Sequence, residues 1–272
     1  MGSDVASHVA AGSPVGQAGR TVVRLVDVAK SFGAFRAVDG VSLDFSAGET
    51  AGIVGPNGAG KTTLFGLISG AHPVSSGRIW LKGRDVTGLS SLRRARRGVS
   101  RTFQTARVFP GLTVAQHFML VTPDASGRRL GWMRSRLALS GDAGRMIAAA
   151  AEDVGLAGLL DVPAANLPQA QRKILDLAMA LAGDPDVLLL DEPTAGVASE
   201  DVAAIEALTS RLRMRRPDVT VIVSSHDADL IARMCSRIVV LVRGTVLADG
   251  PTAEVVNDAR VRAAYFGDVV HV

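Results

Sequence analysis

The sequence has a single cysteine, Cys235, among its 272 residues. One cysteine excludes an intrachain disulfide framework and any metal site built from several cysteines, and it fits a reducing compartment. Long apolar runs are also missing, since the longest, such as Val187–Leu190 and Ile238–Val242, have the length of a strand. A membrane-spanning helix needs about 20 apolar residues, so we do not expect this chain to cross a membrane by itself.

The chain also lacks a strong charge of either sign. Lys and Arg number 30 against 26 Asp and Glu, and the net charge of +4 indicates an anionic partner only weakly. Residues 1–20 are small and turn-prone, without the charged start and apolar run of a secretory signal. We therefore expect a disordered leader over residues 1–20.

From Thr21 onward, strand-like and helix-like segments alternate. VVRLVDVAKSF and VSLDF surround a glycine-containing turn and are typical of an antiparallel pair. AGIVG, DVLLLDE and TVIVSSH are short apolar strands separated by amphipathic helices, whereas residues 113–160 are rich in Ala and Arg with helical periodicity. This order predicts an α/β fold with a mainly parallel central sheet, an antiparallel β part and a separate helical lobe.

The stretch GPNGAGKT, Gly55 to Thr62, has the spacing G-x-x-x-x-G-K-[ST] and lies between a predicted strand and a predicted helix. Glycines allow successive backbone amides to surround phosphate oxygens at the positive end of the helix. Lys61 is then expected to reach the β- and γ-phosphates, and the Thr62 hydroxyl to bind Mg²⁺. An ordinary glycine-rich turn is the alternative, and the flanking strand and helix disfavour it.

Two adjacent acids, Asp191 and Glu192, end the apolar strand VLLLDE. Open α/β sheets bind their ligands at the carboxyl edge of the strands. Asp191 suits the Mg²⁺ shell, and Glu192 suits a base that polarises the attacking water. The alternative is that the two acids only mark the start of a helix, and the presence of a phosphate loop in the same chain disfavours it.

These motifs, together with Gln104, the stretches LPQAQR and DEPTAG, and the strand-terminal His226, follow one another as in ABC-type ATPase domains. The chain resembles that family over roughly residues 21–268, with residues 269–272 as a tail. The stretches SRTFQTARVFPGLTVAQH and GTVLADGPTAEVVNDARVRAAYFGD are similar to the importer group for branched-chain amino acids. The resemblance implies a P-loop NTPase fold with a helical subdomain at about residues 105–182.

The resemblance also implies roles for single residues. Phe32 would stack on adenine, with Phe35 as a competitor and a core Phe as the alternative reading. Gln104 would touch Mg²⁺ and the attacking water, and His226 the γ-phosphate. The ATP-binding residues would be Gly55, Pro56, Asn57, Gly58, Ala59, Gly60, Lys61, Thr62 and Thr63, with Leu167 and Gln171 contributing from the family's signature.

LPQAQR occupies the place of that signature, usually L-S-G-G-Q. Leu167 and Gln171 are kept, while Pro168, Gln169 and Ala170 replace the serine and the two glycines, and some members of the importer group tolerate the first two changes. Ala198 is a further departure, where the family commonly has Asp or Asn. Losing the serine hydroxyl removes one hydrogen bond to a charged group, worth about 1.5–3 kcal/mol. We expect a weakened but not abolished contact with the opposite subunit's ATP.

The resemblance predicts an ATP- and Mg²⁺-dependent ATPase that energises an importer for branched-chain or related hydrophobic amino acids or amides. Its expected partners are transmembrane permease subunits, a second ATPase subunit and, indirectly, a solute-binding protein, at the cytoplasmic face of the membrane. A weakly hydrolysing regulatory subunit in an asymmetric dimer is one alternative.

A non-transport ATPase acting on nucleic acid is the other alternative. The stretch between Lys61 and Asp191 has no heptads, and the chain carries one ATPase unit and one cysteine. The basic cluster Arg93–Arg97 is interpreted as a solvated helix, so no nucleic-acid partner is expected.

Overall fold

The computed structural model describes residues 20–121 and 141–266. The predicted leader, apart from Arg20, and the predicted tail at residues 269–272 lie outside the described residues, as does part of the segment with helical periodicity. Within the described residues, no helix is both long enough and apolar enough to span a bilayer.

A six-stranded sheet forms the centre of the molecule, in the order β10-β9-β3-β8-β7-β6. The pairs among β9, β3, β8, β7 and β6 are parallel, and β10 is antiparallel to β9. This arrangement confirms the predicted, mainly parallel core. The strands are β3 (Thr50–Val54), β6 (Val99–Arg101), β7 (Val187–Asp191), β8 (Thr220–Ser225), β9 (Arg237–Val242) and β10 (Thr245–Pro251).

The antiparallel part is a four-stranded sheet in the order β2-β1-β4-β5. Its first two strands face each other from the pair Thr21 and Ser46 to the pair Phe32 and Phe35, as the sequence predicts. The bounds are β1 (Thr21–Phe32), β2 (Phe35–Ser46), β4 (Ser76–Leu81) and β5 (Arg84–Asp85). The sequence did not predict β6, a short strand that pairs with β7 and lies at the edge of the sheet formed by the described residues.

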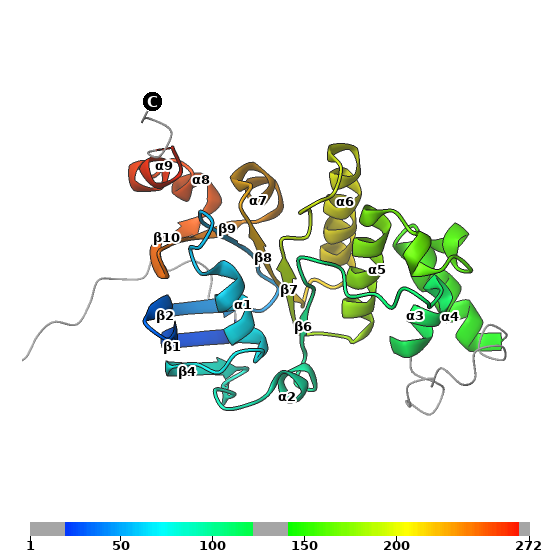
Figure 1. Ribbon diagram of the computed structural model, residues 1–272, viewed down its shortest axis with the longest axis horizontal. Coiled ribbons are helices and arrows are strands. Elements are labelled where there is room, and N and C mark those ends of the chain that lie inside the picture. Colours follow the sequence, from blue (N-terminus) through cyan, green and yellow to red (C-terminus); the bar gives the residue numbers. More distant parts are fainter. Residues whose placement is uncertain (1–19, 122–140, 267–272) are drawn as a thin grey trace, which may run out of the picture.

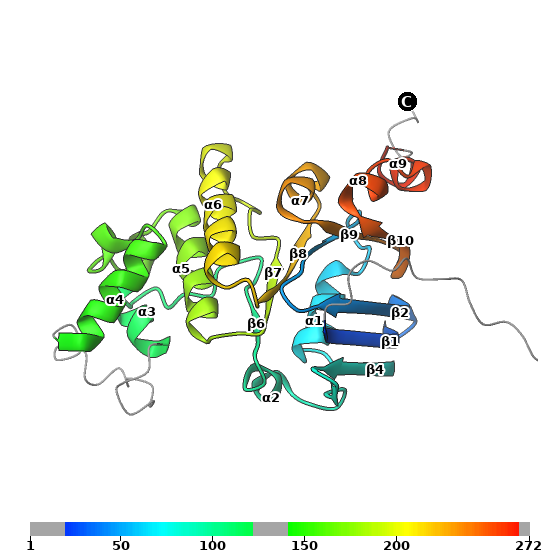
Figure 2. The ribbon, with the colours of Figure 1, turned by 180° about the vertical axis from the view of Figure 1, so that it is seen from behind.

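Helices α3, α4 and α5 lie together on the side of the central sheet opposite the antiparallel sheet (Figures 1 and 2). They fall within the residues for which a helical subdomain is predicted. The α-helices are α1 (Lys61–Ser69), α2 (Ser91–Ala95), α3 (Val114–Val121), α4 (Gly141–Asp153), α5 (Gln169–Ala182), α6 (Ser199–Arg215), α7 (Ala228–Met234), α8 (Thr252–Val255) and α9 (Ala259–Phe266), with short 3₁₀ turns at Ala157–Leu159 and Ala164–Asn166.

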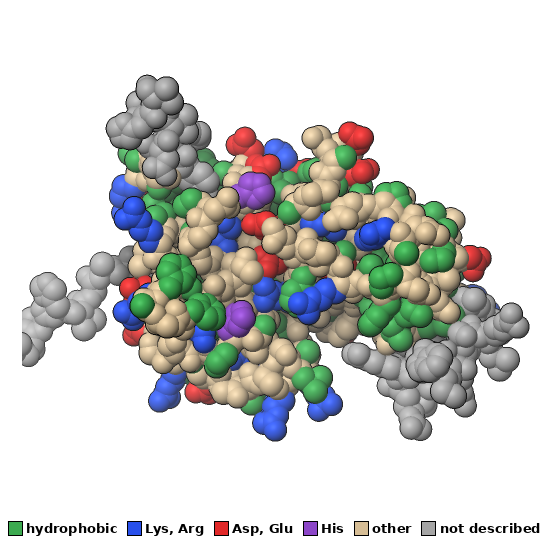
Figure 3. Space-filling view, in the orientation of Figure 1, with side chains coloured by type: hydrophobic (Ala, Val, Ile, Leu, Met, Phe, Trp, Pro, Cys, Tyr) green, Lys and Arg blue, Asp and Glu red, His purple; other side chains and the backbone are tan. Residues whose placement is uncertain are grey.

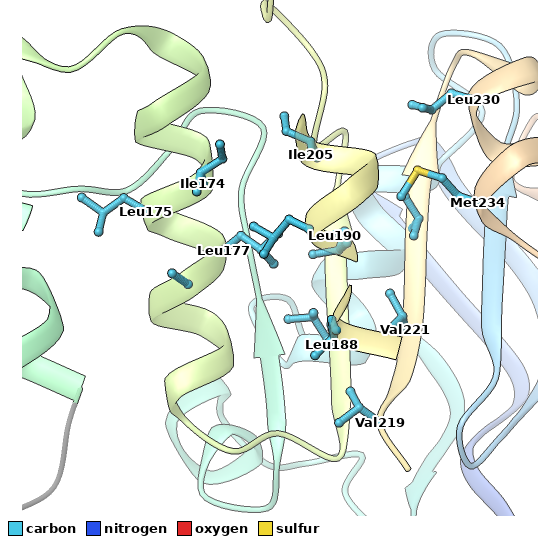
Figure 4. Packing of buried hydrophobic residues seen from close by; sticks show 14 of the residues in the cluster. Ile174, Leu175, Leu177, Leu188, Leu190, Ile205, Val219, Val221, Leu230 and Met234 are labelled. Atoms are coloured by element: carbon cyan, nitrogen blue, oxygen red, sulfur yellow. The ribbon is translucent and has the colours of Figure 1, made fainter. Parts of the chain in front are cut away.

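Strand β7 is apolar on both faces because both faces are covered. Leu188 and Leu190 point into the cluster that contains α5 and α6, whereas Val187 and Leu189 point into the cluster around α1. Figure 4 shows Ile174 and Leu177 of α5 in the first of these clusters. The carboxyl end of β7 is thereby fixed between two packed layers.

One arginine of the basic cluster contradicts the sequence prediction. Arg94 is 1% exposed, and its guanidinium donates to the carbonyls of Leu67 (2.6 Å) and Ile68 (2.9 Å) near the end of α1. It also donates to the carbonyls of Thr87 (3.0 Å) and Leu89 (3.2 Å). The other arginines, Arg93, Arg96 and Arg97, are exposed as predicted. Arg94 joins the end of α1 to the segment before α2 through these carbonyls, so it is a structural residue.

Replacing Arg94 by Met should lower the free energy of unfolding by at least about 3 kcal/mol, because several buried carbonyls lose a charged donor. Urea denaturation of the full chain measures the loss. Arg93→Met, an exposed change in the same short helix, is the matched control and should shift stability by less than about 0.5 kcal/mol. Equal effects of the two changes would show that Arg94 does not hold α1.

Candidate functional site

The loop between β3 and α1 has backbone conformations that require glycine. Gly58 and Gly60 have φ angles of 79° and 102°. A Cβ on Gly60 would lie 2.3 Å from the carbonyl oxygen of Ala37, and one on Gly55 would lie 2.3 Å from that of Leu241. The loop is therefore pressed against two neighbouring strands, and its tip, from Pro56 to Gly58, is exposed.

Lys61 begins α1 and is turned back over this loop. Its Nζ donates to the carbonyls of Gly55 (2.6 Å) and Pro56 (3.2 Å), and the residue is 6% exposed. Burial lowers the pKa of the ammonium, while the charges of Glu192 and Asp191 act in the opposite direction. The Lys61 charge therefore lies in the same electrostatic environment as both predicted acids.

Asp191, at the end of β7, is 2% exposed and has a partner on each oxygen. Arg101 Nη2 donates to Oδ2 at 2.7 Å, and Ser224 Oγ donates to Oδ1 at 2.8 Å. The Arg101 side chain is itself only 8% exposed, so this is a buried ion pair between β6 and β7. Two elements beside β7 fix the orientation of the carboxylate before any ligand arrives.

Glu192 has a left-handed backbone, with φ of 47°, which is strained for a non-glycine residue. Its amide donates to the carbonyl of Ser224 (3.1 Å), and its own carbonyl accepts from Lys173 Nζ of α5 (3.0 Å). Gln104 Nε2 donates to Glu192 Oε2 at 3.0 Å, and His226 Nδ1 lies 3.9 Å from Oε1. Strand β8 and helix α5 thus hold the backbone of Glu192.

Gln104 and His226 approach Glu192 from opposite sides of β7. Gln104 follows β6, His226 follows β8, and both side chains are accessible to solvent. Figure 3 shows acidic, basic and His side chains gathered in the middle of one face, between the antiparallel sheet and the helical part. The carboxyl ends of β6, β7 and β8 therefore bring these predicted residues together.

Phe32 and Phe35, at the tip of the β1–β2 hairpin, are both exposed, at 47% and 63%. The core alternative for Phe32 is therefore wrong. The Phe32 and His72 rings are perpendicular at a centroid distance of 5.8 Å, and Lys30 Nζ lies 5.0 Å from the centre of the Phe32 ring. The stacking of Phe32 on adenine, with Phe35 as its competitor, stays a prediction.

The stretch LPQAQR opens α5. Pro168 is the residue before its first turn and supplies no side-chain cap, and Arg172 donates its amide to the Pro168 carbonyl (3.0 Å). Leu167 and Ala170 are buried at 3% and 5% exposure, whereas Pro168 is exposed. The methyl group of Ala170 therefore lies against its own chain, whereas Pro168 and Gln169 are the two replacements that alter the exposed surface.

Ala198, the other departure from the family's pattern, precedes α6 and likewise supplies no cap.

The sequence did not predict three residues that contact the two acids. Arg101 and Ser224 bind Asp191, and Lys173 binds the Glu192 carbonyl. Arg101 lies in the stretch SRTFQ, which ends at Gln104, and Ser224 lies in VSSH, which ends at His226, but only the strand order brings them to Asp191. In the part of the chain that is described, no group of three or more His, Cys, Asp or Glu residues could enclose a metal ion. The Thr62 hydroxyl and the Asp191 carboxylate still fit Mg²⁺, because this ion usually takes one or two protein oxygens together with phosphates and water.

Two family models match the chain. The ABC transporter model covers residues 38–195, and the model of the branched-chain amino acid ATP-binding cassette transporter covers residues 245–271.

Among curated proteins, the chain is 33% identical to the high-affinity branched-chain amino acid transport ATP-binding protein BraF of Pseudomonas aeruginosa, over 92% of this chain and 99% of that protein. It is 35% identical to the corresponding LivG protein of Escherichia coli, over 87% of this chain and 94% of that protein. A solved ATP-binding cassette of an ABC transporter superposes with a TM-score of 0.78 at 26% identity, covering 90% of this chain and 98% of the other. A solved cassette in its ADP conformation superposes with a TM-score of 0.75 at 28% identity, covering 91% and 99%.

Replacing Gly60 by Ala should disturb the loop, because its left-handed φ and the nearby Ala37 carbonyl leave no space for a methyl group. We expect the affinity for a fluorescent ATP analogue to fall at least about tenfold. This is a loss of ~1.4 kcal/mol in binding free energy, within the range of backbone strain typical of such positions. Gly83→Ala is the matched control, with a φ of 74° and nothing within 4 Å of its added methyl group. The loop assignment fails if both variants bind the analogue like the wild type.

Proposed function

Because the chain belongs to the ABC transporter family of ATP-binding proteins, we propose that it energises an importer for branched-chain amino acids or related hydrophobic amino acids and amides. The observation that carries the ATPase part is the convergence of Lys61, Asp191 and Glu192 at one edge of the central sheet. The substrate class rests on the C-terminal match and on the names of the relatives.

We propose that ATP lies on the loop from Gly55 to Thr63, with its phosphates on the backbone amides and its base on the exposed ring of Phe32. The loop's glycine conformations and the positive start of α1 suit a polyphosphate. Lys61 would exchange the loop carbonyls for phosphate oxygens, which compensate its charge better.

Magnesium, when bound, neutralises charge on the β- and γ-phosphates. Thr62 and Asp191 would hold the ion, and Gln104 would contribute its side-chain oxygen from the other side. Because Arg101 and Ser224 each occupy one Asp191 oxygen, the carboxylate offers only its remaining lone pairs. The two contacts therefore fix the direction from which the ion is held.

Glu192 would orient and polarise the attacking water, and His226 would donate to the γ-phosphate. The Gln104 amide bonds to Glu192 Oε2, and the carboxylate keeps further lone pairs with which to accept a proton from water. The fixed backbone of Glu192 would keep its carboxylate in place during the reaction.

A second ATPase subunit would complete each site with the start of its own α5. Three backbone amides in the first turn of such a helix have no intrahelical partner and can face phosphate. Pro168 supplies no hydroxyl, so we favour pairing with a sister ATPase whose signature retains it. The expected location is the cytoplasmic face of the membrane, bound to permease subunits that a solute-binding protein serves.

Replacing Glu192 by Gln should preserve ATP binding and lower turnover by at least about a hundredfold, because the amide keeps the shape and removes the base. Lys61→Ala should instead abolish binding, since it removes the positive charge that is proposed to contact the phosphates. Fluorescent-nucleotide titration and phosphate release measure the two effects separately. Wild-type turnover in Glu192→Gln would remove Glu192 as the base, and normal binding in Lys61→Ala would refute the phosphate-loop assignment.

Restoring Pro168 to Ser, alone and together with Ala170→Gly, tests the weakened signature. We expect the isolated chain to gain about tenfold in turnover, the value of one hydrogen bond to a charged group. Because Ala170 is buried in its own chain, Ala170→Gly should add little. Thermal melting is the control, since a serine here would also cap α5 and stabilise it by ~1 kcal/mol.

Full activity of the isolated wild-type chain, unchanged by either restoration, would contradict the proposed asymmetry. Persistently negligible turnover with the sister subunit present would favour the regulatory alternative.

Affinity capture from detergent-solubilised membranes tests the partners. We expect the chain to retain membrane permease subunits and a second ATPase, and salt washing to leave the complex intact. Co-purification with nucleic acid and no membrane protein would contradict the transport assignment.

A further inference from the structure

The backbone of Glu192 needs support from its neighbours, because its φ of 47° lies in the left-handed region. Its amide donates to the Ser224 carbonyl at 3.1 Å and to Ser224 Oγ at 3.2 Å. Its carbonyl accepts from the Ala195 amide at 3.1 Å, which closes the turn after β7. These contacts tie the proposed base to β8 and to its own loop.

Lys173 ties the same peptide group to helix α5. Its Nζ donates to the Glu192 carbonyl at 3.0 Å. Lys173 lies one turn after the start of α5 at Gln169. The contact therefore joins the loop that carries the base to the helix that LPQAQR opens.

The position of Lys173 is unfavourable for a cation. The residue is 6% exposed, and its hydrogen bond goes to a neutral carbonyl. It also lines a cavity of about 10 Å³ whose walls include Leu177 and Leu190. An uncharged side chain of similar length would fit these apolar surroundings.

The titration of Lys173 agrees with this view. Burial lowers the pKa of its ammonium, while the charges of the nearby acids, Glu192 first, act in the opposite direction. A lysine whose pKa is lowered on folding makes the fold less stable at neutral pH, because the unfolded chain binds the proton more strongly. A purely stabilising role therefore does not explain a lysine at this position.

We propose that Lys173 is a positioning residue for the ATPase reaction, whose ammonium holds the Glu192 backbone so that the carboxylate stays directed at the attacking water. The proposal rests on the proposed function, because it assigns Lys173 a role at the same base. Lys173 takes no part in the proton transfer, since its contact is with the main-chain carbonyl.

The kinetic test replaces Lys173 by Met in the full chain, which keeps the length of the side chain and removes the charged donor. We expect kcat to fall at least about tenfold, while the affinity for a fluorescent ATP analogue stays within about twofold of the wild type. Lys173→Arg, which keeps a cationic donor, should recover at least about threefold of the lost turnover. No recovery in a folded Lys173→Arg protein would contradict the role of the donated hydrogen bond.

A double-mutant cycle with Glu192→Gln shows whether Lys173 acts through the base. In the Glu192→Gln background, Lys173→Met should change the residual single-turnover rate of phosphate release by less than about twofold. A full tenfold loss in both backgrounds would place the effect of Lys173 elsewhere and overturn the proposal.

Leu175→Ala is the matched control for damage to α5, because Leu175 is fully buried on the same helix. It should lower the melting temperature and leave kcat of the folded protein within about twofold of the wild type. Lys173→Met should do the reverse, melting at or above the wild-type temperature. Equal losses of stability and of kcat in the two variants would show that Lys173 is only structural.

Hydrogen exchange of the nucleotide-free chain provides a readout that does not depend on turnover. Amides in residues 192–197 should exchange at least about fivefold faster in Lys173→Met than in the wild type, while β8 stays protected. Unchanged exchange in this segment would overturn the proposal even if kcat fell. A wild-type chain without ATPase activity but with this exchange pattern would refute the proposed function and leave the hold of Lys173 on Glu192 standing.

Discussion

Two adjacent acids at the end of a buried strand are the constraint on which the site depends. Asp191 is 2% exposed and follows four fully buried residues of β7, so its charge must be compensated within the protein. Arg101 supplies that compensation from β6, and the Lys61 and Lys173 charges lie close enough to be felt from α1 and α5. Elements far apart in the sequence must therefore meet at this edge before the acids can be buried.

The same edge of the sheet also holds a donor whose present partners phosphate can replace. Lys61 is held by neutral carbonyl oxygens, and a charged phosphate oxygen would be the stronger acceptor. Asp191 and the Glu192 backbone, in contrast, are fixed by β6, β8 and α5. Fixed acids and exchangeable donors are the arrangement that phosphoryl transfer requires, since most of its catalysis is positioning and charge stabilisation.

Much of this arrangement could be predicted from the sequence, because the main signals are local. The phosphate loop, the strand that ends in two acids and the strand before His226 can each be recognised from a few neighbouring residues. The missed contacts depend on strand order: Arg101 reaches Asp191 only because the unpredicted β6 lies beside β7. Arg94 was misjudged for a related reason, since nothing along the chain separates it from the exposed arginines around it.

The central claim, that Mg²⁺ and ATP bind between the Gly55–Thr63 loop and the acids of β7, is tested most directly by a crystal structure of the wild-type chain with magnesium and a non-hydrolysable ATP analogue. We predict the triphosphate on the loop amides, the base against Phe32, and the metal between Thr62, Asp191 and the phosphates, with Arg101 still paired to Asp191. A triphosphate bound elsewhere, or a metal that contacts neither Thr62 nor Asp191, would contradict this account.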